Sequence, residues 1–430
     1  MIKIIKYDKF KSLPSNPDIN PGTVTADVAL IIADVIQRGD EALREYTEKF
    51  DGCTLDSFEL PSSALDAATQ EVGSEFMGVM ERAAKNIENF HRNQINKGFD
   101  LPPKDGVILG QRVTPIERVG LYIPGGTAPY PSSVLMNCIP AKIAGVNEII
   151  ITTPPSKHKE ENSFYGIDSG ILAAAKIAGV DRVFAIGGAQ AIAALAYGTE
   201  TVPRVDKITG PGNAYVAEAK RQVFGIVGID MIAGPSDILI IADKTADPVL
   251  IAADMLSQCE HGADSPAILV TESMDLANKV KNEIESQLSE LPRGKIAREA
   301  INEHGKIIIA GSIKKAFEIS NEIAPEHLEI FLDEPFKYLD SVKNAGSIFL
   351  GKNTPEALGD YYAGPNHILP TSGTARFSSQ LSVDDFVKKS SYTYFTKEAL
   401  HNAGDDVIKF AEKEGLAAHA MSVSKRIKRK

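Results

Sequence analysis

The chain has 430 residues, which predicts two or three domains, and its 43% hydrophobic and 24% charged content is ordinary for a globular protein. A net charge of −11 argues against a general nucleic-acid-binding protein, because such proteins need a basic surface to neutralise phosphates. Three cysteines give no disulfide framework and indicate a reducing compartment. We find no signal peptide and no apolar run long enough to span a membrane, so we expect a cytoplasmic protein.

The first quarter of the chain is expected to be mainly helical. An extended segment and a Pro/Gly-rich link cover residues 1–22. Apolar residues then recur at helical spacing and predict a helix from Thr23 to about Phe50. A second helix is expected from Ser62, which offers an N-terminal cap, to about Asn96.

The middle of the chain alternates short β-branched runs with helical segments. Strands are expected at 119–124, 148–152, 182–186 and from 207, and a charged surface excursion at 157–163. Two near-copies, 141–146 and 175–180, each place a glycine at the end of a helix before a strand. Repeated units of this size are typical of βαβ connections and predict a parallel sheet with helical crossovers.

The same alternation continues to about residue 350, and no further βα units follow residue 385. The fold class that we predict is α/β, with two Rossmann-like parallel-sheet domains, a helical N-terminal segment and a small C-terminal appendage. The basic tail 425–430 is expected to be a solvated end. The predicted division is an N-terminal segment 1–25, a discontinuous first domain 26–128 plus 238–380, an inserted domain 129–237, and an appendage 381–430.

Glu326 and His327 follow Pro325 and form the first candidate for chemistry. Because a proline fits the first turn of a helix or an extended entry, we expect both side chains at an element boundary. A glutamate and a histidine can divide proton transfers between them, since their ordinary pKa values cover mildly acidic to neutral pH. The alternative is an exposed helix start, with the glutamate favoured by the helix dipole.

Gln258 and His261 are the second candidate, because they lie three residues apart at the end of an amphipathic helix. Their side-chain oxygen and nitrogen are plausible ligands for a borderline divalent metal. The alternative is an ordinary helix end with a histidine near the negative end of the dipole. Cys259 lies beside Glu260, which would raise the pKa of the thiol, so we interpret it as a packed residue.

Three further residues have open interpretations from their surroundings. Asp360 and His367 lie in a Gly/Pro-rich loop, where each could be a turn former or a ligand. His419 lies among small residues, and spacing alone does not bring it onto one helical face with Glu414.

Glycine-rich turns at 125–126, 187–188 and 210–212 each precede a helix, where backbone N–H groups can receive phosphate. None has the G-x-G-x-x-G pattern with an acidic residue about 20 positions later. Each could be a structural turn, but three in one parallel α/β unit favour a nucleotide-binding crevice.

Taken together, these segments resemble one family, histidinol dehydrogenase, over nearly the whole chain. The motifs are GLYIPGG (120–126), YPSSVLM (130–136), IGGAQAIA (186–193), TGPGNAYV (209–216), AGPSD (233–237), SQCEHGAD (257–264), APEHLE (324–329), GDY (359–361), GPNHILPT (364–371) and EGLAAH (414–419).

The resemblance implies a role for each candidate residue. Glu326 and His327 would be the catalytic acid–base pair. The implied zinc ligands, with one zinc ion per subunit, are Gln258, His261, Asp360 and His419. The implied contacts to the substrate are Ser236, Gln258, His261, His327, Asp360, His367, Glu414 and His419. The implied NAD contacts are Tyr130, Gln190 and Asn213.

The resemblance also implies the reaction and the assembly. The expected reaction takes L-histidinol through L-histidinal to L-histidine, the last two steps of histidine biosynthesis, with two NAD⁺ reduced. The expected assembly is a homodimer in which Glu414 and His419 act in the partner's site. Two other classes stay open from the residues alone: a zinc hydrolase in which Glu326 activates metal-bound water, and a metal-dependent small-molecule-binding protein.

Overall fold

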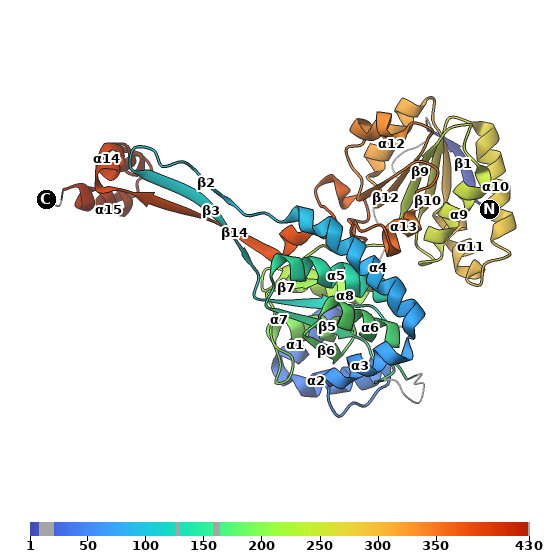
Figure 1. Cartoon of the computed structure of the whole chain (residues 1–430), viewed down its shortest axis with the longest axis horizontal. Helices are drawn as coiled ribbons and strands as arrows, with labels where there is room; N and C mark the ends of the chain where they lie inside the picture. Colours follow the sequence, from blue (N-terminus) through green and yellow to red (C-terminus); the bar gives the residue numbers. More distant parts are fainter. Residues whose placement is uncertain (8–20, 126–128, 158–163, 429–430) are drawn as a thin grey trace. The chain divides into compact units, whose positions relative to one another are not determined.

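A computed structural model of the chain describes residues 1–7, 21–125, 129–157 and 164–428. Parts of the 1–22 link, of the turn at 125–126, of the charged excursion 157–163 and of the basic tail lie outside the described residues. The chain forms two compact units, the first made of Met1–Gln94 and Ile116–Phe386 and the second of Ile95–Pro115 and Val387–Lys430 (Figure 1).

One parallel sheet of the first unit has the strand order β6-β5-β4-β7-β8. Its strands are β4 (Arg118–Tyr122), β5 (Glu148–Thr153), β6 (Arg182–Ala185), β7 (Lys207–Thr209) and β8 (Gly228–Ile229). Its helices are α1 (Pro21–Arg38), α2 (Asp40–Tyr46), α3 (Ser62–Glu71), α4 (Ser74–His91), α5 (Pro131–Ala144), α6 (Ser169–Ala178), α7 (Gly188–Tyr197) and α8 (Ala214–Val223). Because β4 comes first and later strands are added on both of its sides, the strand order reverses between β4 and β7.

The second parallel sheet of this unit has the order β1-β11-β10-β9-β12-β13. Its strands are β1 (Lys3–Lys6), β9 (Ile238–Ala242), β10 (Ala267–Thr271), β11 (Lys306–Ile309), β12 (His327–Phe331) and β13 (Ser347–Leu350). Its helices are α9 (Pro248–Cys259), α10 (Met274–Gln287), α11 (Gly294–Glu303), α12 (Ile313–Ile323) and α13 (Glu356–Tyr361). Short π or 3₁₀ turns cover Thr47–Asp51, Arg92–Gln94, Pro335–Ser341, Thr374–Arg376 and Val383–Phe386.

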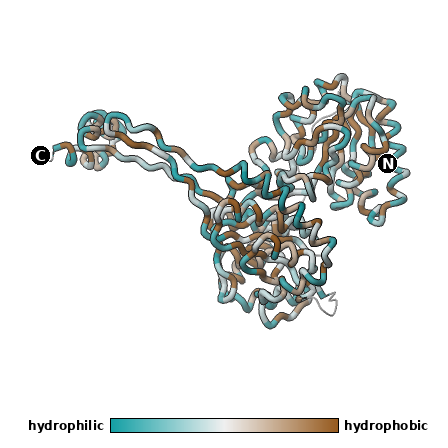
Figure 2. The backbone as a smooth tube through the Cα atoms, in the orientation of Figure 1, coloured by the Kyte–Doolittle hydropathy of each residue, from teal (hydrophilic) through white to brown (hydrophobic). Residues whose placement is uncertain are grey.

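The strands of this sheet are rich in hydrophobic residues (Figure 2), and their buried side chains divide between two hydrophobic clusters, as expected when helices cover both faces. Ile238 and Ile240 of β9 pack in one hydrophobic cluster, and Leu239 and Ile241 pack in the other. Glu329 is the exception, because it is a buried acid in the middle of β12.

The second unit is a three-stranded antiparallel sheet followed by two packed helices. Its elements are β2 (Phe99–Asp100), β3 (Val107–Pro115), β14 (Val387–Phe395), α14 (Lys397–Lys413) and α15 (Ala417–Ile427). β14 pairs with β3 along its whole length, although more than 270 positions separate the two strands in the chain.

The predicted fold class is confirmed, but two predicted helices are wrong in length. The expected helix 23–50 breaks at Gly39 (φ 54°), and the expected helix 62–96 breaks at Gly73 (φ 80°). Both glycines have positive φ, a conformation that ends a regular helix. The helices over 21–91 share one hydrophobic cluster with the five-stranded sheet.

Candidate functional site

The first two candidate residues lie where β12 begins, next to the start of β9. Asp237 precedes β9, and four short contacts join it to Glu326 and His327. The backbone N–H of Asp237 donates to Glu326 Oε2 (3.0 Å), and the backbone N–H of Glu326 donates to Asp237 Oδ1 (3.0 Å). The Asp237 carbonyl accepts from the backbone N–H of His327 (3.2 Å) and lies 2.9 Å from its Nδ1. The element boundary is therefore the start of a strand, not of a helix.

These contacts determine the tautomer of His327. A carbonyl oxygen only accepts hydrogen bonds, so the 2.9 Å contact places the ring proton on Nδ1. Nε2 then carries the lone pair, and this buried atom has no hydrogen-bond partner among the described residues. The arrangement leaves His327 with a basic nitrogen that is ready to accept a proton.

Burial shifts the pKa values of all three groups. It raises the pKa of Glu326 well above its ordinary value, and the neighbouring Asp237 carboxylate raises it further. Burial also raises the pKa of Asp237 to about 6 and lowers the pKa of His327 to about 4. His327 is therefore a neutral imidazole near pH 7, and Glu326 is a stronger base than an exposed glutamate when it is ionised.

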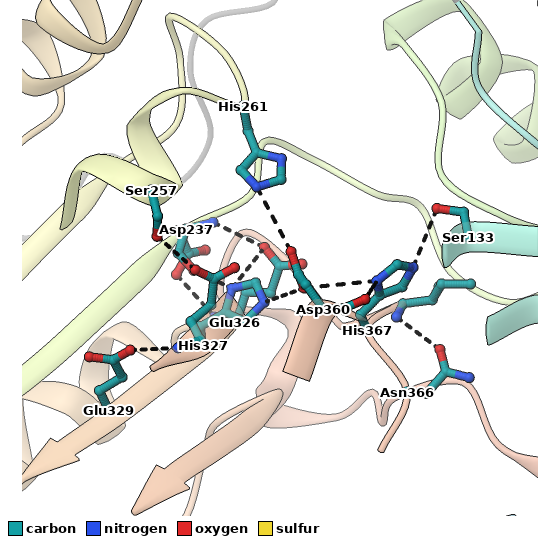
Figure 3. A network of polar contacts seen from close by, with 12 residues as sticks. Ser133, Asp237, Ser257, His261, Glu326, His327, Glu329, Asp360, Asn366 and His367 are labelled. Carbon is teal, nitrogen blue, oxygen red and sulfur yellow. Dashed lines mark hydrogen bonds and ion pairs between the residues drawn. The ribbon is translucent and has the colours of Figure 1, made fainter. Parts of the chain in front are cut away.

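The candidate metal ligands of the first unit gather beside this pair. His261, Asp360 and also Glu356 offer ligand atoms that all lie within 4.8 Å of one another. His261 Nε2 is 3.9 Å from Asp360 Oδ2, and His327 Nε2 is 4.0 Å from Asp360 Oδ1 (Figure 3). Gln258 lies in the last turn of α9 and is fully buried, yet neither of its amide atoms has a hydrogen-bond partner among the described residues.

His367 is held at both ring nitrogens. Its Nδ1 is 2.9 Å from the backbone carbonyl of Asp360, and its Nε2 is 3.3 Å from Ser133 Oγ in the first turn of α5 (Figure 3). The side chain is only 12% exposed, and this burial lowers its pKa to about 4. His367, Asp360 and His327 also line a cavity of about 140 Å³.

Two buried glutamates of this region were missed by the sequence analysis. Glu356 begins α13 and hydrogen-bonds through its side chain to Asp360, and Ser257 Oγ donates to Glu356 Oε2 (2.9 Å). The backbone N–H of Glu356 donates to Glu329 Oε1 (2.8 Å). Burial raises the pKa of Glu356 to about 8 and the pKa of Glu329 well above its ordinary value. The available sequence signals were the four-residue spacing of Glu356 and Asp360 and an acid within an apolar strand.

The three expected NAD contacts follow strands of the five-stranded sheet. Tyr130 precedes α5, Gln190 lies in the first turn of α7, and Asn213 caps α8 by accepting from two backbone N–H groups. α5 and α8 follow β4 and β7, between which the strand order reverses. Ligands of open α/β sheets bind outside the carboxyl ends of the strands at such a reversal. Gln190 is also buried, with no hydrogen-bond partner for its amide among the described residues.

A buried ion pair holds the glycine turn that leads to Asn213. Lys220 Nζ contacts the Asp230 carboxylate and donates to the Gly210 carbonyl (2.9 Å), while the backbone N–H of Gly210 donates to Asp230 Oδ2 (2.8 Å). Gly210 has a φ of 111°, and a Cβ there would lie 2.1 Å from the Tyr122 carbonyl oxygen, so no other residue fits.

The remaining candidates lie at different places. Ser236 precedes Asp237 and hydrogen-bonds through its side chain to Glu326. Glu414 and His419 belong to the second unit, where Glu414 follows α14 and His419 lies in the first turn of α15. Both are exposed.

Among the helices of the described residues, we find none with the length and hydrophobicity that a membrane span requires.

Comparisons with known proteins agree on one family. The histidinol dehydrogenase family matches residues 15–427. The chain is 52% identical to a histidinol dehydrogenase of Clostridium acetobutylicum over 419 residues, which are 97% of this chain and 96% of the relative. It is 54% identical to one of Bacillus cereus over 416 residues, with 96% and 95% covered.

The solved structures include a crystal structure of histidinol dehydrogenase from Elizabethkingia anophelis. It matches with a TM-score of 0.90 and 39% identity, and the match covers 99% of this chain and 98% of that one. From these matches over nearly its whole length, the chain belongs to the histidinol dehydrogenase family and is a dehydrogenase.

Proposed function

We propose that this protein oxidises L-histidinol through L-histidinal to L-histidine, reduces two NAD⁺ and holds its substrate at a zinc ion. The observation that carries the proposal is the meeting of three features: the buried Nε2 of His327, which has no hydrogen-bond partner among the described residues, the buried Glu326 carboxyl group, and the His261–Asp360 pair, in which His261 is exposed. This arrangement combines a base for the alcohol, a base for water and donors for a metal.

The donor set fits zinc. His261 and Asp360 supply an imidazole nitrogen and a carboxylate oxygen, which zinc accepts in proteins, and Gln258 adds an amide oxygen, which is an unusual zinc ligand. The fully buried amide of Gln258, without a hydrogen-bond partner among the described residues, suits a ligand role. We propose that His419 of the partner subunit completes the set.

Bound zinc would coordinate the imidazole and amine of histidinol and so orient its carbinol carbon. NAD⁺ would accept the hydride from that carbon. In the first oxidation, His327 Nε2 takes the hydroxyl proton as the hydride leaves the carbinol carbon. The Asp237 carbonyl accepts from Nδ1–H throughout and stabilises the imidazolium that forms.

In the second oxidation, Glu326 takes a proton from water as the water oxygen attacks the aldehyde carbon, and His327 returns the proton gained in the first oxidation to the aldehyde oxygen, which gives the hydrated aldehyde and a neutral His327. His327 then takes the hydroxyl proton of the hydrated aldehyde while its hydride passes to the second NAD⁺. Burial of both bases keeps the reactive aldehyde away from bulk water. The buried Cys259, whose pKa is raised to about 12 by burial, has no part in this scheme.

We further infer that residues 129–237 bind NAD through Tyr130, Gln190 and Asn213. The support is their place at helix N-termini along the carboxyl edge of the five-stranded sheet, with α5 and α8 at the strand-order reversal.

We also propose a homodimer that shares its sites. The second unit exposes a set of large apolar side chains, which monomeric proteins rarely leave in water. These are Ile95, Phe99, Leu101, Leu109, Tyr394, Phe395, Val407, Phe410, Leu416 and Met421. Because Glu414 and His419 lie in this same unit, an interface formed by it would carry both residues into the partner's site.

The test is the NADH yield from limiting L-histidinol, with and without a chelator. Two NADH per histidinol, lost on zinc removal and regained on its return, are expected. One NADH would contradict the role of Glu326 in the second step. No NADH from folded, zinc-loaded protein would contradict the substrate, and the hydrolase and binding-protein alternatives would then be tested by substrate cleavage and by calorimetry.

A further inference from the structure

We propose that Glu356 is a positioning residue that holds together the two helices bearing the zinc ligands of this subunit. The inference rests on the proposed function, because it concerns how the proposed zinc site is held. Gln258 belongs to α9, His261 lies two residues after the end of that helix, and Asp360 belongs to α13. The proposed ligands therefore keep fixed positions relative to one another only if a contact holds α9 and α13 together.

Glu356 provides this link through its side chain. One carboxyl oxygen, Oε2, accepts a hydrogen bond from Ser257 Oγ (2.9 Å), and Ser257 directly precedes Gln258 in α9. The same side chain hydrogen-bonds to Asp360, one helical turn further along α13. Glu356 thus contacts one ligand directly and the neighbour of another.

The strand that carries the catalytic pair anchors the start of the same helix. Glu329 lies two residues after His327 in β12, and its Oε1 accepts from the backbone N–H of Glu356 (2.8 Å). The first N–H groups of a helix have no carbonyl partner within the helix. At the start of α13, the buried Glu329 carboxyl group supplies that partner for Glu356. Movements of α13 relative to β12 would break this bond, so Asp360 is also held relative to His327.

Burying the carboxyl groups of Glu329 and Glu356 costs free energy, which favours a functional role for these two residues. Glu329 and Glu356 are both 2% exposed, and apolar residues at these positions would avoid the cost of burying carboxyl groups. The contacts of Glu356 are less consistent with a direct role as a metal ligand, because its carboxyl group already forms hydrogen bonds with Ser257 and Asp360. Groups that hydrogen-bond metal ligands typically contribute 10- to 100-fold to metal affinity.

The experiment measures the zinc affinity of the metal-free, full-length protein by competition with a chromophoric chelator. Glu356→Ala is expected to weaken zinc binding by about 10- to 100-fold. Glu356→Gln keeps an oxygen that accepts from Ser257 and an N–H that donates to Asp360, so its affinity is expected within about threefold of the wild type. Ser257→Ala removes one of the two links and is expected to weaken binding by about three- to tenfold.

Two controls separate this role from general damage. Glu285→Ala in α10 removes a glutamate that pairs with Arg298, and it is expected to leave zinc affinity unchanged. NAD affinity, measured by NADH fluorescence, is expected to stay unchanged in all variants, whereas partial unfolding would reduce it.

Four outcomes would overturn the inference, and the last of them would also contradict the proposed function. Wild-type affinity in Glu356→Ala would overturn the inference, and if that variant fails to fold, wild-type affinity in Ser257→Ala would do the same. A loss in Glu356→Gln as large as in Glu356→Ala would show that the carboxylate itself binds zinc. A wild-type protein that binds no zinc would instead contradict the proposed function, and this inference with it.

Discussion

At the scale of single residues, the proposed chemistry depends on Asp237, the last residue of the AGPSD motif, to which the sequence alone assigns no role. Its backbone and side chain make the contacts that orient Glu326 and fix the proton of His327 on Nδ1. Because both proposed bases are held by Asp237, the role of each can be tested by a substitution that keeps its contact to Asp237.

The change Glu326→Gln is expected to separate the two oxidations. Glutamine still offers an oxygen to the Asp237 N–H but takes no proton from water, so the second oxidation should fall by about 10²–10⁴-fold. The measurement is NADH per limiting histidinol, with one instead of two expected. Glu318→Gln on the exposed face of α12 is the control. Unimpaired formation of histidine by Glu326→Gln would rule out water activation by this residue.

The pH dependence of stability should report buried histidines. Burial lowers the pKa of His91, while the unfolded chain takes up its proton near pH 6.5. Stability is therefore fully present above pH 6.5 and is lost as the pH falls from there towards the lower folded-state pKa. His91→Gln should make the Tm fall less steeply between pH 8 and pH 5. Some slope remains, because burial also lowers the pKa of His327 and of His367 to about 4. Parallel Tm curves for wild type and variant would refute the assignment.

At the scale of elements, glycine turns and the contacts behind them decide where a cofactor can approach. The turn at Gly210 has a backbone that only glycine fits, and the buried Lys220–Asp230 pair holds it from within the core. Disturbing the pair is therefore expected to weaken the proposed NAD binding and to leave the proposed zinc binding unchanged.

Lys220→Met is expected to destabilise the protein by about 3–5 kcal/mol, because Asp230 stays buried without its cation. The KM for NAD⁺ should rise while zinc affinity stays constant. The double variant Lys220→Met/Asp230→Asn should recover part of the stability, since it removes the unpaired charge. An unchanged KM for NAD⁺ in folded Lys220→Met would show that the Lys220–Asp230 pair does not contribute to NAD binding.

At the scale of the whole molecule, the chain divides its candidate residues between two compact units. The proposed zinc donors Gln258, His261 and Asp360 lie in the first unit, and Glu414 and His419 lie in the second, with its many exposed apolar side chains. A shared site in a dimer would use both units of both chains.

Mixing two inactive variants tests this sharing. Gln258→Ala and His419→Ala should each be inactive as homodimers. After unfolding and refolding together, mixed dimers should regain one intact site, so activity should recover to about a quarter of the wild-type value by random pairing. The dimers are verified by tagged co-purification. No recovery in verified mixed dimers would contradict a site shared between subunits.

The sequence by itself determined the α/β class, because β-branched runs and helical periodicity are local signals repeated along the chain. It also located Glu326, His327, Gln258 and His261 at the ends of elements, since proline and glycine mark such ends. Helix breaks at Gly39 and Gly73 were missed because a glycine inside a helical pattern does not reveal its φ angle.

Only the tertiary structure decided which distant residues meet. Asp237 acts on Glu326 from 89 positions away, and Ser257 reaches Glu356 across 99 positions, because parallel strands and the helices between them bring these segments together. The pairing of β3 with β14 is equally invisible in the sequence. Such contacts depend on strand order and register, which arise from packing of the whole sheet and not from any local pattern.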